Sequence, residues 1–423
     1  MDAHPLREVM LGWTRVPPPR FVGGNQLELL QGGAELFPRM CQAIRQATRE
    51  VWLATYIFHD DAAAQTVAQA LIDAAARGVA VHVVVDGFGS IATMPRVRAM
   101  FVGSKVRLEV FRPLDRWYSW LQPGQLRRLH QKLCVCDDTA FVGGINIIDD
   151  RHDMNHGWTD QPRLDFAVAV RGPLAQAVLV TARATWARSH LWHGWRDEVR
   201  DIARSAKPVK EAMSLLRELR GNPGPPAIDE HTPMRAAFLV RDNLRQRRSI
   251  ERRYVEAIRH ARDRVDIAVP YFYPGRGFRS ALRKAAKRGV RVRLLLQGKI
   301  DYRIAALAAQ VLYAEMHSTG ICIYEYTPAF LHAKVAIVDA DWCTVGSSNI
   351  DPLSLLLNLE ANVVVRDADF AQALTQCFDR ALAVSTEVVA APTRSGPRSW
   401  LRRIVIAWAA NLYLRVAGIT GRY

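Results

Sequence analysis

Two stretches of the chain repeat the same spacing of histidine, lysine and aspartate. They read His130-Gln-Lys132-Leu-Cys-Val-Cys-Asp137 and His332-Ala-Lys334-Val-Ala-Ile-Val-Asp339. Each is followed by a turn of small residues that ends in asparagine, first Val142-Gly-Gly-Ile-Asn146 and then Val345-Gly-Ser-Ser-Asn349. One such match could arise by chance. Two matches that are each followed by the same kind of turn indicate that both stretches do related chemistry.

This pattern supplies the groups that a phosphoryl-transfer site needs. The apolar run after each lysine is typical of a buried strand, and side chains two apart on a strand lie on the same face. A neutral imidazole can act as a nucleophile and an imidazolium as an acid, while a neighbouring ammonium stabilises an anionic oxygen. Each stretch therefore predicts half of a phosphoryl-transfer site. The candidate catalytic residues are His130, Lys132, Asp137, His332, Lys334 and Asp339.

The turns after the two motifs predict further contacts with a phosphate. Backbone N–H groups of a turn rich in small residues, together with an asparagine amide, are phosphate-binding groups. The candidates are Gly144, Asn146, Ser347 and Asn349. The aspartates of the motifs, Asp137 and Asp339, come at the ends of their strands, and we expect them to hold turns by hydrogen bonds.

Each half also carries an acid that leads into an apolar strand. Asp165 lies downstream of His130, in Arg-Leu-Asp165-Phe-Ala-Val-Ala-Val, and Glu360 lies downstream of His332, in Asn-Leu-Glu360-Ala-Asn-Val-Val-Val. A carboxylate on the far ring nitrogen of a histidine fixes its tautomer and orientation. We expect Asp165 and Glu360 to orient the histidines. The alternative is that both are ordinary acids at strand edges.

The segments around the motifs repeat as well, with strands and helices in alternation. Val51-Trp-Leu-Ala-Thr-Tyr-Ile-Phe58 matches Val265-Asp-Ile-Ala-Val-Pro-Tyr-Phe272, and the segment 71–87 matches 282–298. This alternation predicts an α/β class of fold, built from two homologous sandwich domains with the active site between them. The predicted division is a lead-in at 1–20, a first domain at 21–196, a linker at 197–233, a second domain at 234–392 and a tail at 393–423.

Composition indicates an anionic partner. The chain has 57 lysines and arginines against 41 acidic residues, a formal net charge of +16, which favours nucleic acid or an anionic membrane surface. The six cysteines show no ligand or disulfide pattern, so we expect a reducing compartment. We also expect no signal peptide and no membrane span.

Two aromatic segments predict contact with a membrane interface. Trp117 and Trp120 lie among arginines just before the first motif, a mixture that suits lipid headgroups; stacking on single-stranded nucleic acid is the alternative. Trp400 and Trp408 lie in the tail, where polar residues fall on one helical face and apolar residues cover the rest. This pattern favours a helix lying in the interface, and a helix packed in the core is the alternative.

The paired motifs resemble those of the phospholipase D superfamily, and the match covers nearly the whole chain. The segments Phe141-Val-Gly-Gly-Ile-Asn146 and Val345-Gly-Ser-Ser-Asn-Ile-Asp-Pro-Leu-Ser354 are most similar to bacterial cardiolipin synthases, in particular the cardiolipin synthase B branch. The resemblance implies two phospholipase D-like α/β/α sandwich domains packed with pseudo-symmetry. It also implies a protein peripheral to the cytoplasmic side of the bacterial cell membrane.

The activity implied by the resemblance is transfer of a phosphatidyl group through a covalent phosphatidyl-histidine. His130 would be the nucleophile and His332 the general acid and base, with phosphatidylglycerol as donor and acceptor and with cardiolipin and glycerol as products. We expect no metal and no cofactor, because the two lysines supply the positive charge, and no nucleic-acid partner. Alternatives are a hydrolytic phospholipase D or a phosphodiesterase or nuclease of the same superfamily, and a non-catalytic binding protein that retains the fold.

Overall fold

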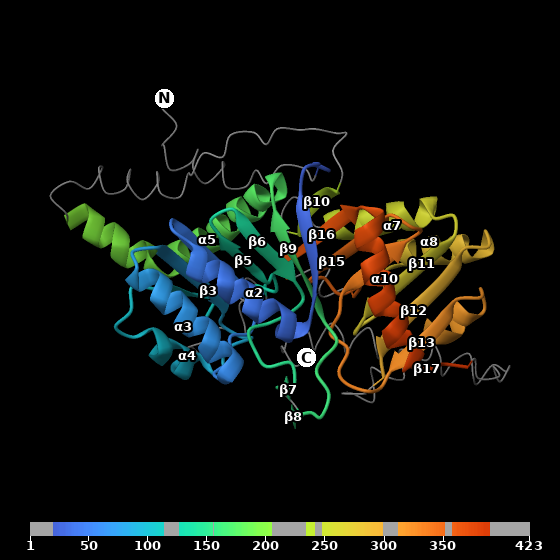
Figure 1. Ribbon diagram of the computed structural model, residues 1–423, viewed down its shortest axis with the longest axis horizontal. Coiled ribbons are helices and arrows are strands. Elements are labelled where there is room, and N and C mark those ends of the chain that lie inside the picture. The colour runs from blue at the N-terminus through green and yellow to red at the C-terminus, as the bar shows by residue number, and fades with distance from the viewer. Residues whose placement is uncertain are drawn as a thin grey trace.

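The computed structural model shows two α/β halves that lie side by side (Figure 1). It describes residues 20–113, 127–154, 156–204, 234–241, 248–298, 312–351 and 358–389, with the side chains of 191–204 excepted. The predicted membrane contacts at Trp117, Trp120, Trp400 and Trp408 therefore lie outside the described residues. So do the tail at 393–423, most of the linker, and the lead-in up to residue 19.

The first half is a seven-stranded sheet between two layers of helices. Its strand order is β1-β9-β6-β5-β2-β3-β4. The strands are β1 (Gln26–Gln31), β2 (Glu50–Thr55), β3 (Ala80–Asp86), β4 (Arg107–Phe111), β5 (Leu133–Cys136), β6 (Thr139–Gly143) and β9 (Phe166–Arg171). Helices α2 (Gly32–Gln46), α3 (Ala62–Ala76) and α4 (Met94–Phe101) share one apolar core with the sheet, and α5 (Pro173–Arg204) packs against its other face. Strands β2, β3 and β4 are parallel, and the inner strands β2 and β3 are mostly apolar and buried, as strands covered on both faces must be.

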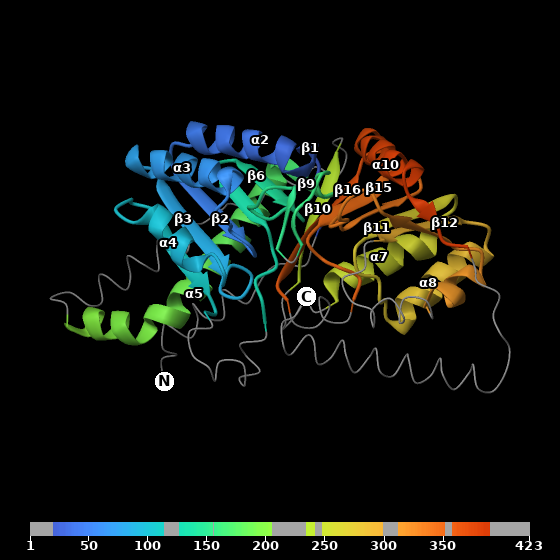
Figure 2. The same cartoon turned by 90° about the horizontal axis from the view of Figure 1, so that it is seen from below.

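The second half repeats this arrangement. Its eight strands follow the order β10-β16-β15-β14-β11-β12-β13-β17. They are β10 (Arg235–Arg241), β11 (Arg264–Val269), β12 (Arg291–Gln297), β13 (Cys322–Tyr326), β14 (Val335–Val338), β15 (Trp342–Gly346), β16 (Glu360–Arg366) and β17 (Thr386–Glu387). Helices α7 (Ser249–His260) and α8 (Arg276–Lys287) cover one face, and α10 (Ala368–Ala383) covers the other (Figure 2). The two sandwiches confirm the predicted fold class.

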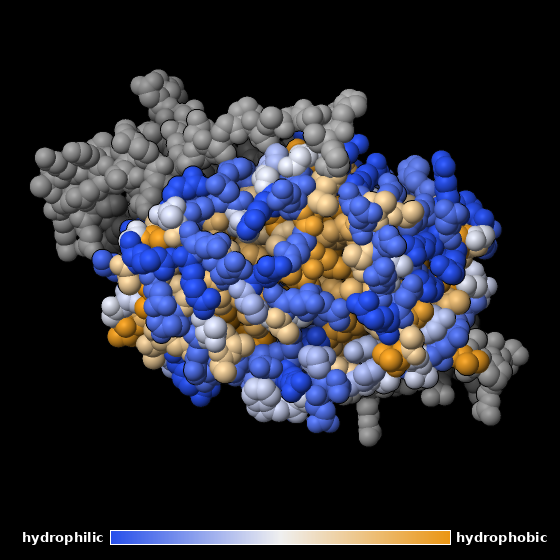
Figure 3. Space-filling model, in the orientation of Figure 1, coloured by the Kyte–Doolittle hydropathy of each residue, from blue (hydrophilic) through white to orange (hydrophobic). Residues whose placement is uncertain are grey.

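One apolar core joins the two halves. It combines Val142 and Val168 of the first sheet with Val345 and Val363 of the second, all fully buried, and each such side chain contributes about 1.5–3 kcal/mol on burial. Strands β6 and β9 lie against β15 and β16, in the middle of the molecule. On the face seen in Figure 3, apolar residues gather along this middle region between hydrophilic flanks.

Some boundaries differ from the predicted ones. Helix α5 continues to Arg204, so the segment 197–204, predicted as the start of the linker, is helical. That segment contains neither glycine nor proline to end a helix. A small antiparallel hairpin of β7 (His152–Asp153) and β8 (Gly157–Trp158), which was not predicted, lies at the lower edge of the molecule in Figure 1. No helix of the described part of the chain is long and apolar enough to cross a membrane.

Candidate active site

The two histidine segments are each anchored by the opposite half of the molecule. The N–H of His130 donates to the carbonyl of Leu359 at 3.0 Å, just before β16, and the N–H of Leu359 donates to the carbonyl of Arg128 at 2.8 Å. In the same way, the N–H of His332 donates to the carbonyl of Leu164 at 2.9 Å, just before β9. Each histidine is thus held beside the segment that carries the other half's acid.

The orienting carboxylates are exchanged between the halves. His130 Nδ1 lies 2.9 Å from Oε2 and 3.0 Å from Oε1 of Glu360, and His332 Nδ1 lies 2.5 Å from Oδ2 of Asp165. Both carboxylates orient a histidine as expected, but each belongs to the half that carries the other motif. An acid on Nδ1 holds the proton there and leaves the Nε2 lone pair free for chemistry.

The exchanged carboxylates bring the two motifs into one site, where the charges of each motif act on the other. Burial is the main cause that lowers the pKa values of His130, Lys132 and His332. The charge of Lys334 lowers those of His130 and Lys132 further, and the charges of Lys132 and His130 do the same to His332. The histidine side chains are 12% and 24% exposed for His130 and His332, whereas their carboxylates are almost fully buried. The imidazoles are therefore reachable while the groups that orient them are shielded.

The lysines are buried, and burial weakens their hold on a proton. Lys132 is 5% exposed and Lys334 is 1% exposed. Each Nζ donates to the carbonyl oxygen of the histidine two positions earlier, at 2.8 Å for Lys132. Because burial disfavours a charge, the pKa of Lys132 falls to about 7 and that of Lys334 to about 8.

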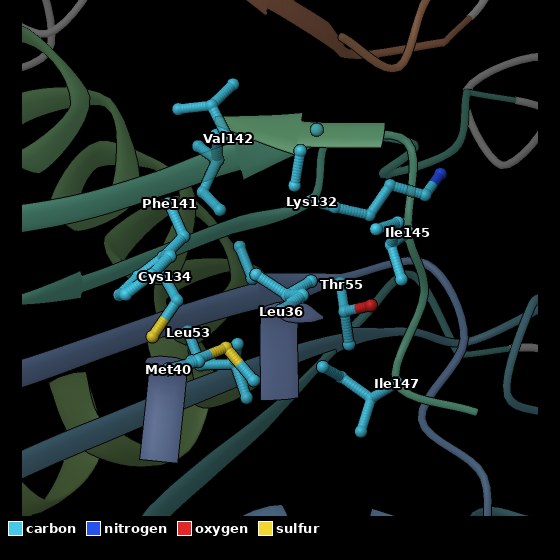
Figure 4. Close-up of a pocket in the computed structure, with 14 residues that line it drawn as sticks. Leu36, Met40, Leu53, Thr55, Lys132, Cys134, Phe141, Val142, Ile145 and Ile147 are labelled. Carbon is cyan, nitrogen blue, oxygen red and sulfur yellow. The ribbon is translucent and has the colours of Figure 1, made fainter. Parts of the chain in front are cut away.

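An apolar pocket contributes to this desolvation of Lys132. Leu36, Leu53, Ile145 and Ile147 line it together with the lysine side chain. Figure 4 shows the Lys132 side chain running away from Met40 and Cys134, so that its nitrogen lies beyond the apolar side chains. The ammonium therefore has apolar side chains on one side only. An anion bound on its other side, in the site, is its best charge partner.

Burial also keeps the histidines neutral before substrate binds. Desolvation lowers the pKa of His130, although the Glu360 carboxylate opposes it. Desolvation and the charge of Lys334 together hold the pKa of His332 well below its ordinary value. Burial raises the pKa of Asp165 to about 6. Burial alone would do the same to Glu360, but the charges of His130 and Lys132 outweigh it, so the pKa of Glu360 is lowered.

Gly144 and Ser347 occupy equivalent turns and support different acids. A Cβ at Gly144 would lie 2.3 Å from Oδ1 of Asp165, so only glycine leaves room for that carboxylate. The Ser347 hydroxyl instead donates to Oε2 of Glu360 at 2.5 Å. Gly144 therefore leaves room for its acid, and Ser347 orients its acid through a hydrogen bond.

The expected phosphate contact through the N–H groups of these turns is wrong for Gly144 and Ser347. Their N–H groups donate to the carbonyls of Phe166 and Ala361, at 2.9 and 3.0 Å. The sheet hydrogen bonds of β6 with β9, and of β15 with β16, extend into the turns and take up these donors. Phosphate contact in the candidate site therefore depends on side chains.

Asn146 and Asn349 stand in equivalent positions after the two turns. Oδ1 of Asn146 accepts from the N–H of Ile57 at 3.2 Å, which leaves the amide NH₂ as the donor. Oδ1 of Asn349 is buried and has no hydrogen-bond partner within the described part of the chain. Asn146 is thus held by the backbone after β2 in an orientation that makes it a donor.

Asp137 and Asp339 lie at the opposite ends of β5 and β14 from the histidines. Asp137 accepts from the N–H groups of Thr48, Arg49 and Glu50, at 2.9–3.1 Å. Asp339 accepts from the equivalent N–H groups of Arg262, Asp263 and Arg264. Burial would raise the pKa of Asp137, but these hydrogen bonds outweigh it and hold the pKa low. These contacts support the expected turn-holding role over a place among the catalytic groups.

Asp86 and Gln297 position the histidine segments, and neither was predicted. Oδ2 of Asp86 accepts the N–H of Leu129 at 2.7 Å, and Oε1 of Gln297 accepts the N–H of Leu331 at 2.6 Å. These are the residues immediately before His130 and His332. The signal was present, because Asp86 and Gln297 both end a buried strand just before a glycine at matching points of the repeat.

Tyr56 and Arg163 were also missed. The Tyr56 ring meets the His130 ring edge to face, with 5.0 Å between centroids, and Lys132 Nζ lies 5.3 Å from its centroid. The charge of Arg163 lowers the pKa of His332 and of Lys334. The repeat conceals Tyr56, because Pro270 stands at the matching position of the second half.

A family model described as cardiolipin synthase, PLD-like domain, matches residues 40–158 and 254–382. Among curated proteins, cardiolipin synthase B of Salmonella typhi is 37% identical over 356 residues, which cover 83% of this chain and 79% of that protein. Cardiolipin synthase B of Escherichia coli K12 is 33% identical over 398 residues, or 91% and 87% of the two chains. Cardiolipin synthase A of Pseudomonas fluorescens is 31% identical over 368 residues, which cover 87% of this chain and 70% of that protein.

Solved structures show the same fold. Phosphatidylserine synthase of Haemophilus influenzae Rd KW20 aligns with a TM-score of 0.60 over 99% of both chains, at 13% identity. Polyphosphate kinase of Porphyromonas gingivalis aligns with a TM-score of 0.51 over 93% of this chain and 53% of that one, at 14% identity. At these identities the likeness concerns the fold alone.

Proposed function

The chain belongs to the cardiolipin synthase family of proteins with phospholipase D-like domains, and from this premise we propose that it transfers a phosphatidyl group between phosphatidylglycerol molecules. The products are cardiolipin and glycerol. One observation carries the proposal: two histidines, each with its own lysine and buried carboxylate, converge from the two halves on one site. That arrangement supplies a nucleophile, an acid and positive charge for two successive displacements at one phosphorus.

In the first step His130 attacks and His332 protonates. Nε2 of His130 forms a bond to the phosphorus of phosphatidylglycerol, and the bond from phosphorus to the glycerol oxygen breaks. His332 gives a proton from Nε2 to that oxygen, and glycerol departs. Lys132, Lys334 and Asn146, with Asn349, bind the phosphate oxygens on which charge develops.

The second step reverses these roles. His332 takes a proton from the free hydroxyl of a second phosphatidylglycerol, whose oxygen attacks the phosphorus. The bond between phosphorus and His130 breaks, and cardiolipin leaves. Both imidazoles return to their starting protonation, so the cycle needs no other reactant.

Substrate binding supplies the charges that the reaction needs. His332 must be protonated in the first step, yet before binding its pKa is held low by burial and by the charge of Lys334. An anionic phosphodiester offsets the positive charges and raises the pKa values of the lysines and histidines together. The two lysines and His332 therefore become charged when an anion enters the site, while His130 stays neutral as the nucleophile.

The two carboxylates support the order of roles. Glu360 has a lowered pKa and stays ionised, which fixes His130 as a neutral nucleophile with its proton on Nδ1. Burial raises the pKa of Asp165 to about 6, so its pair with His332 can hold and release a proton in each cycle.

We further propose that the protein works at the cytoplasmic face of the bacterial membrane as a peripheral protein. The net charge of +16 favours an anionic lipid surface. The interface contacts are proposed for Trp117, Trp120, Trp400 and Trp408. Acceptors other than phosphatidylglycerol are compatible with the same chemistry, because any lipid hydroxyl can take the second step.

The test is purified protein with phosphatidylglycerol vesicles, with lipid products resolved by mass spectrometry. Cardiolipin with an equal amount of glycerol is the expected result. His130→Ala abolishes turnover, and His332→Asn slows it and lets phosphatidyl-histidine accumulate on His130. His260→Ala is the matched control, because His260 lies on the exposed surface of α7.

Two outcomes would contradict the proposed activity, and a third would reverse the assigned roles of the two histidines. Phosphatidic acid as the sole product means that water is the acceptor and that the protein is a hydrolase. Cleavage of nucleic acid without action on lipid means a nuclease. A label mapped to His332 reverses the two roles and leaves the chemistry intact.

A further inference from the structure

A second cluster of functional side chains lies outside the histidine–lysine site. His59 follows β2, Asp61 caps helix α3, and His152 begins the β7–β8 hairpin. One ligand atom from each lies within 4.8 Å of the others. Oδ2 of Asp61 is 3.2 Å from Nδ1 of His59 and 3.9 Å from Nδ1 of His152. The two rings meet edge to face, with 4.5 Å between centroids.

Two ring nitrogens in this cluster are buried and lack hydrogen bonds. Among the residues that the structure describes, Nδ1 of His59 and Nδ1 of His152 have no hydrogen-bond partner, although the carboxylates of Asp60 and Asp61 both lie 3.2 Å from the former. The two imidazole side chains are 12% and 19% exposed. Buried polar atoms without partners cost free energy, and such atoms mark places where a water or ion belongs.

Backbone N–H groups outside the cluster hold the Asp61 carboxylate in place. Oδ1 of Asp61 accepts from the N–H of Ala64 at 3.0 Å, at the first turn of α3. Oδ2 accepts from the N–H of Asp149 at 2.9 Å. Backbone groups that fix a ligating carboxylate are a regular feature of metal sites, because they orient the oxygen before the ion arrives.

The spacing and the types of donor atom point to one class of metal ion. We propose that His59, Asp61 and His152 bind a divalent transition-metal ion of the Zn²⁺ class. Two imidazoles with a carboxylate suit such ions better than Mg²⁺ or Ca²⁺, which prefer oxygen ligands alone. Tetrahedral bonds of 2.0–2.2 Å put neighbouring ligand atoms roughly 3.4 Å apart, and the measured 3.2 and 3.9 Å bracket that value.

The ion would join two segments that are far apart in the sequence. One is the connection between β2 and α3, and the other is the β7–β8 hairpin, which carries the exposed Trp158 stacked on His152 at 5.0 Å. The carbonyl of His152 accepts from Arg163 at 2.6 Å, and the charge of Arg163 acts on His332 and Lys334. The metal thus holds the hairpin and, through it, the arginine beside the second histidine.

The proposal is tested by metal binding to the full-length protein. The protein is stripped with a chelator and titrated with Zn²⁺ by equilibrium dialysis, and with Co²⁺ by visible absorption. Wild type is expected to bind one equivalent and to gain about 3 °C in Tm at a hundredfold excess over Kd. His59→Gln and His152→Gln are expected to lose both. His156→Gln is the matched control, because His156 lies on the same hairpin and contacts Asp153.

A second readout guards against variants that fail to fold. Hydrogen exchange of the β7–β8 hairpin in wild type should slow when Zn²⁺ is added, while exchange in the second sheet stays unchanged. Failure of wild type to bind overturns the site. Metal binding by both glutamine variants that equals binding by the wild type also overturns it. A thiolate charge-transfer band with Co²⁺ does the same, because it places the ion on cysteines.

Discussion

Replacing Gly144 with alanine tests how closely the site depends on the exchanged carboxylates. The new Cβ would lie 2.3 Å from Oδ1 of Asp165, where an ordinary contact needs at least 3.4 Å. The backbone of Gly144 is not in the left-handed region, so the contact is the sole source of strain. Asp165 must retreat by about 1 Å and take His332 out of line. A displacement of that size costs on the order of 100-fold in rate.

The assay separates the two chemical steps. With phosphatidylglycerol, which needs a protonated leaving group, Gly144→Ala should lower kcat about 100-fold. With a phosphatidyl nitrophenol, whose leaving group departs without a proton, the burst that forms phosphatidyl-His130 should survive. Turnover after the burst should still be slow, because His332 must activate the incoming hydroxyl.

Gly277→Ala is the matched control. This glycine lies in α8, and a Cβ there meets no atom within 4 Å. Its activity should be unchanged and its thermal stability unchanged or slightly higher. If Gly144→Ala keeps more than half of the wild-type rate while its fold is intact, Asp165 does not orient His332 for catalysis and the reasoning is refuted.

Four other predictions follow from the same contacts. The pKa of Lys132, lowered to about 7 by burial, means that its charge is lost as pH rises, so kcat/KM should fall above pH 7; in Lys132→Arg that fall should move to higher pH, as pH–rate profiles would show. Ser347→Ala removes a charge-assisted hydrogen bond to Glu360 worth about 1.5–3 kcal/mol, so kcat/KM should drop about 10- to 100-fold, with no burst on the nitrophenol substrate. Gln297→Leu leaves the N–H of Leu331 without its partner and should cost about 1–3 kcal/mol of stability in urea denaturation. Removal of the residues after Pro397 should lower vesicle binding and activity on vesicles but not activity on short-chain substrate, whereas loss of the fold in a thermal melt would support a core helix instead.

The chemistry of the site could be predicted because it depends on residue types at short spacing. His130 and Lys132 are two apart, and so are His332 and Lys334, and each pair comes just before a buried strand, β5 or β14, so the short spacing keeps each pair together. The repeat also predicted two sheets of the same class. Local pattern is sufficient wherever the interacting groups lie on one strand or one turn.

The exchange of carboxylates could not be predicted, because it depends on how two finished sheets pack. Glu360 is 230 residues from His130, and no periodicity links them. The phosphate contact expected of the Gly144 N–H failed for a related reason: β6 and β9 continue their hydrogen bonding into the turn. The roles of Asp86 and Gln297 could have been predicted, because both end a strand at matching points of the repeat.

The exchange also bears on why the two halves share one chain. A symmetric dimer of a single repeat would have to place the same acid on both imidazoles and the same small residue beneath it. Gene duplication and fusion remove that constraint, because the two copies can then diverge. Here one copy has Asp165 above Gly144, and the other has Glu360 beside Ser347. Separately expressed halves should therefore recover activity on mixing, and neither half should recover it by pairing with itself.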